Sequence, residues 1–144
     1  PRQDPTSKYA SVIPRFIRWA NRGDPLEVHG DGLQSRDFTY IDNVVSANLL
    51  AAHSLEGIGG VFNVGQGKAY TLLDLVELLQ EILGRELHLL HTAERAGDVR
   101  HTLADISQAK RCLGYQPHVS FEEGLARTAK YFSSRIDFIP VRAY

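Results

Sequence analysis

The sequence predicts an α/β fold in which short strands alternate with about five helices. Apolar residues recur every three or four positions in five segments, and shorter apolar runs such as residues 61–64 lie between them. Glycines and N-capping side chains mark the borders of these segments. Because the 144 residues contain no repeat, low-complexity tract or linker, we expect one domain spanning residues 1–144.

The first two helices are predicted to flank a strand and a glycine turn. Apolar spacing over residues 13–20 indicates a helix that Gly23 would end. Residues 26–29 then form a short apolar run, which the turn Gly30-Asp31-Gly32 follows. Asp42 is expected to be the N-cap of the second helix.

Three helices and two strands are predicted in the remainder. Residues 61–64 and 86–91 have strand patterns. Capping-box pairs indicate the starts of the third and the last helix, and Asp105 indicates the start of a short helix between them. The two pairs are Thr71 with Asp74 and Ser120 with Glu123. Gly84 and Gly114 are the expected stops.

Composition excludes several classes of protein. A formal net charge of -1 gives no electrostatic support for nucleic-acid binding. No apolar run reaches the roughly 18 residues of a membrane span, and no signal-peptide pattern is present. Cys112 is the only cysteine, so we expect no intrachain disulfide and a cytoplasmic location. The chain has no methionine and opens on the loop-like stretch Pro1–Pro5, so we expect the C-terminal piece of a longer protein.

Two features of the sequence bear on cofactor and metal binding. Residues 61–64, the turn Gly65-Gln66-Gly67 and a helix follow the order of a dinucleotide-binding unit, but the third glycine of its fingerprint is missing. We interpret this turn as a plain strand-to-helix connection without a cofactor. The six histidines have no metal-ligand spacing and there is no G-x-S-x-G motif, so neither a metal site nor a hydrolase is predicted.

Two arginines are candidate anion ligands. Arg36 and Arg95 both lie in irregular, glycine-containing segments. The planar fork of an arginine binds phosphate through two charge-assisted hydrogen bonds, so two such forks could hold a diphosphate. The alternative is that they pair on the surface with their sequence neighbours, Asp37 and Asp98.

Several ordered motifs make the chain resemble the C-terminal part of extended short-chain dehydrogenases/reductases. The resemblance is to the NAD-dependent epimerase/dehydratase family, and within it to UDP-glucose and UDP-N-acetylglucosamine 4-epimerases. It covers nearly the whole chain. The motifs are Pro1–Pro5, Tyr9–Phe16, Gly30–Gly32, Ser35–Phe38, Tyr40–Asn43, Phe62–Gly65, Arg95–Asp98, Ala104–Asp105 and Leu113–Tyr115.

The resemblance implies the C-terminal portion of an extended Rossmann-type enzyme, with a site for a UDP-sugar. By position, Arg36 and Arg95 would grip the diphosphate, and Asp98 would hold the ribose. Glu27, Val28 and His29 would flank the uracil, and Leu72 and Phe38 would line the nucleotide site. A small residue at Thr102 implies acceptance of N-acetylated sugars, unless this threonine is only a β-branched residue that enters the next segment.

The family's NAD-binding half is absent from this chain. No lysine here is preceded four residues earlier by a tyrosine, so the family's Tyr-x-x-x-Lys pair is missing. We therefore expect NAD in the parent enzyme only, no catalytic or cofactor-binding residue here, and an inactive chain that self-associates without its N-terminal partner half. A nucleotide-sugar dehydratase or decarboxylase, or a non-catalytic nucleotide-sugar-binding module, remains an alternative.

Overall fold

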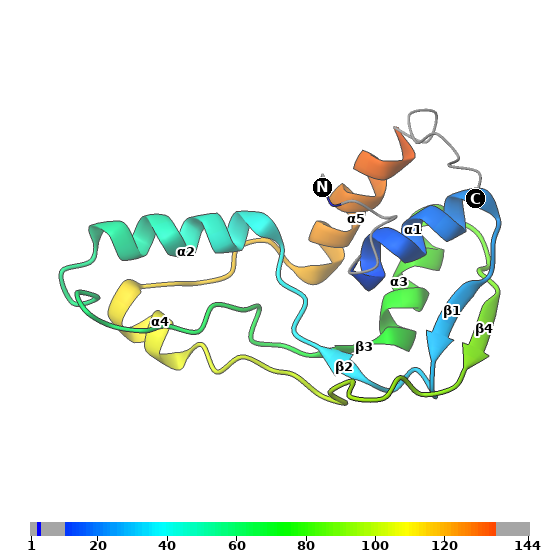
Figure 1. The fold of residues 1–144 in the computed structure, drawn as a ribbon. Coiled ribbons are helices and arrows are strands. Elements are labelled where there is room, and N and C mark those ends of the chain that lie inside the picture. The colour runs from blue at the N-terminus through cyan, green and yellow to red at the C-terminus, as the bar shows by residue number, and fades with distance from the viewer. Residues whose placement is uncertain (1–2, 4–10, 135–144) are drawn as a thin grey trace.

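The computed structural model describes residue 3 and residues 11–134, and it has the expected α/β character (Figure 1). Of the family-like motifs, Pro1–Pro5 apart from Gln3, and Tyr9–Ala10, lie outside the described residues. The elements, in order, are α1 Val12–Arg22, β1 Leu26–His29, β2 Ser35–Arg36, α2 Ile41–His53, β3 Tyr70–Thr71, α3 Leu72–Leu83, β4 Leu89–Thr92, α4 Ser107–Leu113 and α5 Phe121–Ser133. The predicted alternation of five helices with short strands is confirmed.

The strands form two small sheets. β1 and β4 run parallel, with Leu26 opposite Leu89 and His29 opposite Thr92. β2 and β3 run antiparallel, and Ser35 makes a further parallel bridge to His101. Residue 35 therefore joins three segments that are far apart in the sequence.

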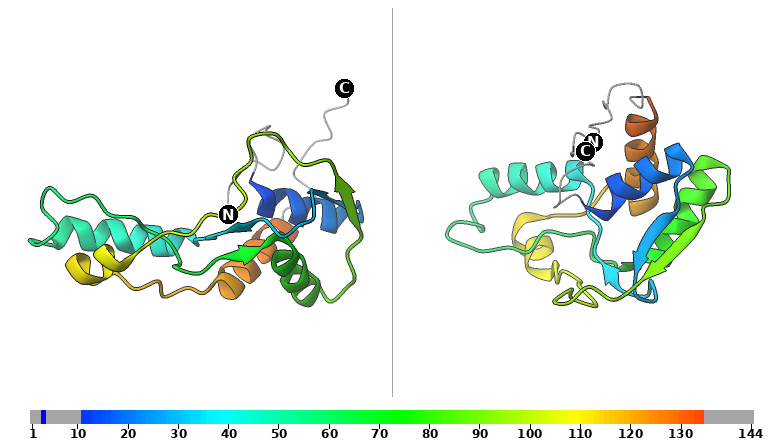
Figure 2. Two further views of the ribbon diagram at one scale, coloured as in Figure 1. Left: turned by 90° about the horizontal axis from the view of Figure 1, so that it is seen from below. Right: turned by 45° about the vertical axis from the view of Figure 1, so that its right-hand side comes forward.

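One hydrophobic core lies where α1, α3 and α5 pack around β1 (Figures 1 and 2). Its most buried members include Phe16, Ile17, Leu26, Leu75 and Leu125. The alternation of β1 places Leu26 and Val28 in this core and leaves Glu27 and His29 half-buried on the other face. That alternation supplies two polar side chains to the surface beside α1.

A second, smaller core holds α2 against α4. It comprises Ala47, Ile106, Ala109, Leu113 and Tyr115. Both helices lie side by side in an arm that projects from the α1/α3/α5 body (Figures 1 and 2).

Local signals for helix ends were mostly correct. Gly23, Gly84 and Gly114 end their helices with positive φ angles, and Thr71 and Asp74 form a complete capping box. Ser120 accepts a hydrogen bond from the Glu123 N–H, whereas the Glu123 carboxylate pairs with Arg127.

The predicted caps of α2 and α4 were misplaced. The N-cap of α2 is Tyr40, and Asp42 lies in the first turn, where its carboxylate pairs with Arg127. The N-cap of α4 is Ile106, although Asp105 accepts a hydrogen bond from the Ser107 N–H one residue later. A side-chain preference therefore indicated both helix starts to within two residues.

Two predicted strands differ from the structure. Residues 61–64 form no strand, because no described segment supplies a ladder for their backbone. The strand expected over residues 86–91 is β4, Leu89–Thr92. It starts later because the Leu87 N–H donates to the side chain of Gln80, while pairing with β1 begins at the His88 carbonyl.

No helix in the described part of the chain combines the length and apolar character needed to cross a membrane.

Candidate functional site

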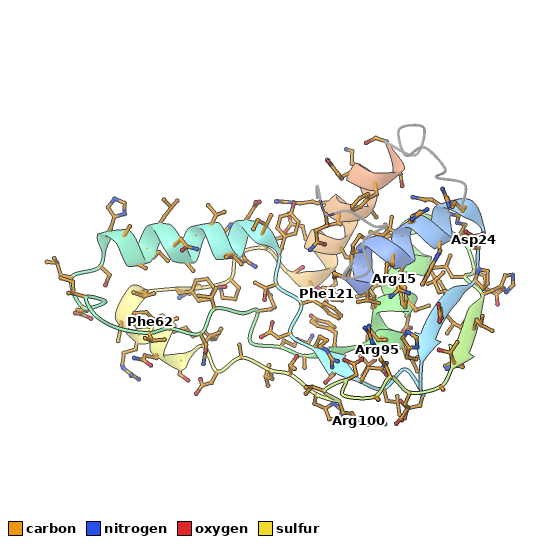
Figure 3. All side chains as sticks on the ribbon, in the orientation of Figure 1. Arg15, Asp24, Phe62, Arg95, Arg100 and Phe121 are labelled. Atoms are coloured by element: carbon orange, nitrogen blue, oxygen red, sulfur yellow. The ribbon has the colours of Figure 1, made fainter. Side chains whose placement is uncertain are left out.

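A cavity of about 400 Å³ lies beside α1, at the outer face of β1 and the start of α3. All the predicted site residues except Val28 and Thr102 line it. Its lining residues are Ser11, Val12, Arg15, Phe16, Glu27, His29, Gln34, Arg36, Phe38, Leu72, Arg95 and Asp98. Figure 3 shows Arg15 and Arg95 reaching this region from α1 and from the loop that follows β4. Segments separated by more than 80 residues thus meet around one hollow.

The two exceptions have structural causes. The Val28 side chain is fully buried in the core, on the face of β1 turned away from the cavity. Thr102 is exposed, and its N–H donates to the Ser35 carbonyl at 3.1 Å. It lies beside Ser35 of β2, and the residue after Ser35, Arg36, does line the cavity.

Arg36 is held rigidly at the cavity. Its Nη1 donates to the carbonyls of Ser35 at 2.8 Å and Arg100 at 3.1 Å, and its Nη2 donates to Oδ1 of Asp98 at 3.1 Å. Arg36 therefore pairs with Asp98 and not with Asp37, so the surface ion pair of the alternative interpretation is present for Arg36. Arg95 is exposed and has no ion pair with any described residue, so its guanidinium is available to a ligand.

Asp37 has a different role. Its carboxylate accepts hydrogen bonds from the N–H groups of Gln66, Gly67 and Ala104, at 2.7, 2.9 and 3.3 Å. A Cβ at Gly65 would come within 2.5 Å of the same carboxylate, which explains why glycine is required there. Asp37 thus binds the turn that resembled a dinucleotide site.

This turn does not fit NAD. A dinucleotide needs free backbone N–H groups at the start of a helix to receive its diphosphate. Here the Asp37 carboxylate occupies the N–H groups of Gln66 and Gly67, and α3 begins only at Leu72. The interpretation as a structural turn agrees with this geometry. In the described part of the chain, no three His, Cys, Asp or Glu side chains cluster as a metal site.

Hydrogen bonds and ion pairs hold the loop that carries Arg95 and Asp98 in place. The Ser35 N–H donates to the Arg100 carbonyl at 2.8 Å, and the Asp98 N–H donates to the Arg95 carbonyl at 3.1 Å. The Arg100 guanidinium pairs with Asp31 at 2.5 Å and with Glu94 at 3.4 Å. A hydrogen bond from the Leu33 N–H lowers the pKa of Asp31 below its usual value, and a hydrogen bond from Arg100 contributes less to the same shift.

Sequence reasoning missed three polar residues at this site. Arg15 projects from α1 and lies 3.8 Å from Glu27. Gln34 donates from Nε2 to the His29 carbonyl at 2.7 Å, and Arg100 joins the loop to the glycine turn. Only Arg15 had a usable signal, since it lies within the family-like motif Tyr9–Phe16.

The site has the chemistry of an anion-binding α/β domain, with three guanidinium groups and two carboxylates at one cavity. Residues 1–65 match the sequence model of the NAD dependent epimerase/dehydratase family. The chain is 35% identical over 137 residues to a UDP-glucuronate 4-epimerase of Thermodesulfobacterium geofontis, covering 94% of this chain and 42% of the relative.

Two solved structures are also similar. The first is a UDP-glucose 4-epimerase of Thermotoga maritima with UDP-glucose. The second is a UDP-N-acetylglucosamine 4-epimerase of Methanobrevibacter ruminantium in complex with UDP-N-acetylmuramic acid. Each matches with a TM-score of 0.87 and 41% identity, over 94% of this chain and 43% of the solved chain.

The resemblance inferred from the motifs is therefore confirmed. The chain is similar to NAD dependent epimerase/dehydratase family proteins, and the family model covers its residues 1–65. It spans about two fifths of the length of the relatives that it matches.

Proposed function

We propose that this chain forms the substrate-binding part of a nucleotide-sugar C4-epimerase, acting on UDP-glucose and UDP-galactose or on the N-acetylated pair. One observation carries the proposal. The cavity brings together Arg36, Arg95 and Asp98 with the apolar walls Leu72 and Phe38. Such a mixture of cations, a carboxylate and apolar surface suits a ligand with a diphosphate, a sugar hydroxyl face and a base.

Each predicted site residue that lines the cavity has a role in this proposal. The forks of Arg36 and Arg95 bind the diphosphate, and the Asp98 carboxylate accepts hydrogen bonds from the ribose hydroxyls. Glu27 and His29 flank the uracil with the backbone of Val28, since the Val28 side chain faces the core. Leu72 and Phe38 close the apolar sides. Relatives solved with UDP-sugars support this assignment.

The role of these residues is to position the substrate. Epimerisation at C4 requires the sugar to present both faces in turn, so the diphosphate must be tethered firmly while the ring moves. The backbone carbonyls that fix Arg36 suit a tether of this kind. We propose that the redox chemistry at C4 belongs to NAD and to residues outside this chain, and that the chain alone is inactive.

The proposal is tested by replacing each of the two arginines, Arg36 and Arg95, in the complete gene product. Hydrogen bonds to charged groups contribute on the order of 1.5–3 kcal/mol each, and exposure of Arg95 reduces this figure. We expect Arg36→Ala and Arg95→Ala each to weaken UDP binding by about tenfold in calorimetric titrations. Uridine, which has no diphosphate, should bind almost as before.

Arg111→Ala is the matched control, because this exposed arginine lies on α4, away from the cavity. Equal losses for UDP and uridine would mean that the two arginines are structural. A dehydratase or decarboxylase of the same family would bind the same nucleotide, so the product formed from the UDP-sugar separates that alternative. A binding module would form no product.

A further inference from the structure

The ion pair between Arg36 and Asp98 occupies the site proposed for a diphosphate. Nη1 of Arg36 donates to two backbone carbonyls, so turning the guanidinium away would break both hydrogen bonds. Nη2 donates to Oδ1 of Asp98 at 3.1 Å. An anion that reaches this fork must share or replace a contact that a carboxylate of the protein already makes.

The geometry points to Asp98 as a specificity-determining residue that excludes free inorganic anions from Arg36. We propose that its carboxylate competes with phosphate and pyrophosphate for the guanidinium, and that a nucleotide overcomes this competition. The claim that a nucleotide overcomes the competition rests on the proposed function. The competition itself depends only on the observed ion pair.

The chemistry of the ligands explains the discrimination. A carboxylate accepts hydrogen bonds and has none to donate, and the same holds for the charged oxygens of pyrophosphate. The two groups therefore repel each other when both approach Arg36. A ribose instead offers two hydroxyl donors to Asp98, so the same carboxylate opposes a bare anion and attracts a nucleoside diphosphate.

Neighbouring charges do not substitute for Asp98. The Glu94 and Asp31 carboxylates pair with Arg100 rather than with Arg36. The turn that holds Asp98 also carries Arg95, because the Asp98 N–H donates to the Arg95 carbonyl. Asp98 thus sits on the one described turn that contributes both a cation and an anion to the cavity.

The test compares pyrophosphate and UDP binding in Asp98→Asn and wild-type forms of the complete gene product. The side chains of Arg36 and Asp98 are 25% and 50% exposed, so the ion pair is of the weak, solvent-screened kind. We expect Asp98→Asn to bind pyrophosphate about two- to fivefold tighter at low ionic strength, and less so at high salt. Its preference for UDP over pyrophosphate should fall by at least the same factor.

Glu94→Gln is the charge-matched control, since it removes one negative charge from the same loop without touching Arg36. It should leave the pyrophosphate affinity within about twofold. Melting temperatures of all variants show whether each is folded.

The inference is overturned if folded Asp98→Asn binds pyrophosphate no tighter than wild type, including the case in which neither binds detectably. It is also overturned if Glu94→Gln gives the same gain. Failure of wild-type protein to bind UDP would refute the proposed function, while the pyrophosphate comparison would still decide the role of Asp98.

Discussion

At the scale of single residues, Asn43 joins three parts of the chain through one buried amide. Its Nδ2 donates to the Val119 carbonyl at 2.8 Å and to the Gln66 side chain at 3.1 Å. Its Oδ1 accepts from the N–H groups of His118 and Val119, both at 3.0 Å. Asn43 is fully buried, so water cannot replace any of these contacts.

We therefore predict that Asn43→Ala lowers the free energy of unfolding by about 3 kcal/mol, because each buried polar group left without a partner costs roughly 1–3 kcal/mol. Chemical denaturation of the complete gene product measures this loss. Asn48→Ala is the control on the same helix, where the exposed amide only donates to the Val44 carbonyl. Similar losses for both variants would contradict a special role for Asn43.

Thr102 carries a prediction about the sugar. It lies one residue beyond the His101 bridge to Ser35, beside the strand that presents Arg36. We propose that its small side chain leaves room for a C2 N-acetyl group of a sugar attached to the tethered diphosphate. Thr102→Tyr should lower kcat/KM for UDP-N-acetylglucosamine about tenfold, since overfilling a pocket costs roughly 1–3 kcal/mol.

UDP-glucose, which lacks the acetyl group, should be converted almost normally by Thr102→Tyr, and Thr102→Ser should resemble wild type with both sugars. The specificity proposal fails if wild-type protein does not act on UDP-N-acetylglucosamine, or if both activities fall together.

The motifs indicated residues that the fold brings together, whose roles stay predictions, whereas nothing in the sequence indicated partners that are distant along the chain. The motifs identified Arg36, Arg95 and Asp98, and the structure brings them to one cavity. The sequence offered Asp37 as the neighbour of Arg36, yet the observed partner is Asp98, which lies 62 residues away. The partners of Asn43 are equally remote, and no local pattern could indicate them.

At the scale of helices and strands, the deciding factor is where the hydrogen bonds are made. The capping box of α3 and the glycine stops depend on residues within six positions of one another, so the sequence predicted them correctly. A strand needs a partner from elsewhere in the fold. Residues 61–64 have the apolar composition of a strand but no ladder among the described residues, and β4 is bounded by its pairing with β1.

At the scale of the whole molecule, the arm of α2 and α4 leaves an apolar face exposed. Ile41, Val45 and Leu49 recur every four residues on α2, and about half of each side chain or more is exposed. Leu55, Ile58 and Val61 extend this apolar surface, with exposed fractions of 79% or more. No described segment covers these side chains, and α4 packs against the side of α2 that carries Ala47 and Leu50. Clustered apolar surface of this kind drives association.

We therefore predict that the 144-residue chain, produced alone, self-associates through this face of α2. A double variant, Val45→Glu with Leu49→Lys, replaces two exposed apolar side chains at helical spacing by a charged pair that leaves the small core beneath Ala47 intact. Light scattering over a range of concentrations should show oligomers for wild type and a smaller mean mass for the double variant.

Leu33→Gln is the control, because it removes an equally exposed leucine from the turn beside the cavity instead of from the arm. A wild-type chain that stays monomeric at high concentration would show that the exposed face of α2 does not drive association, and equal effects of both changes would place the contact elsewhere.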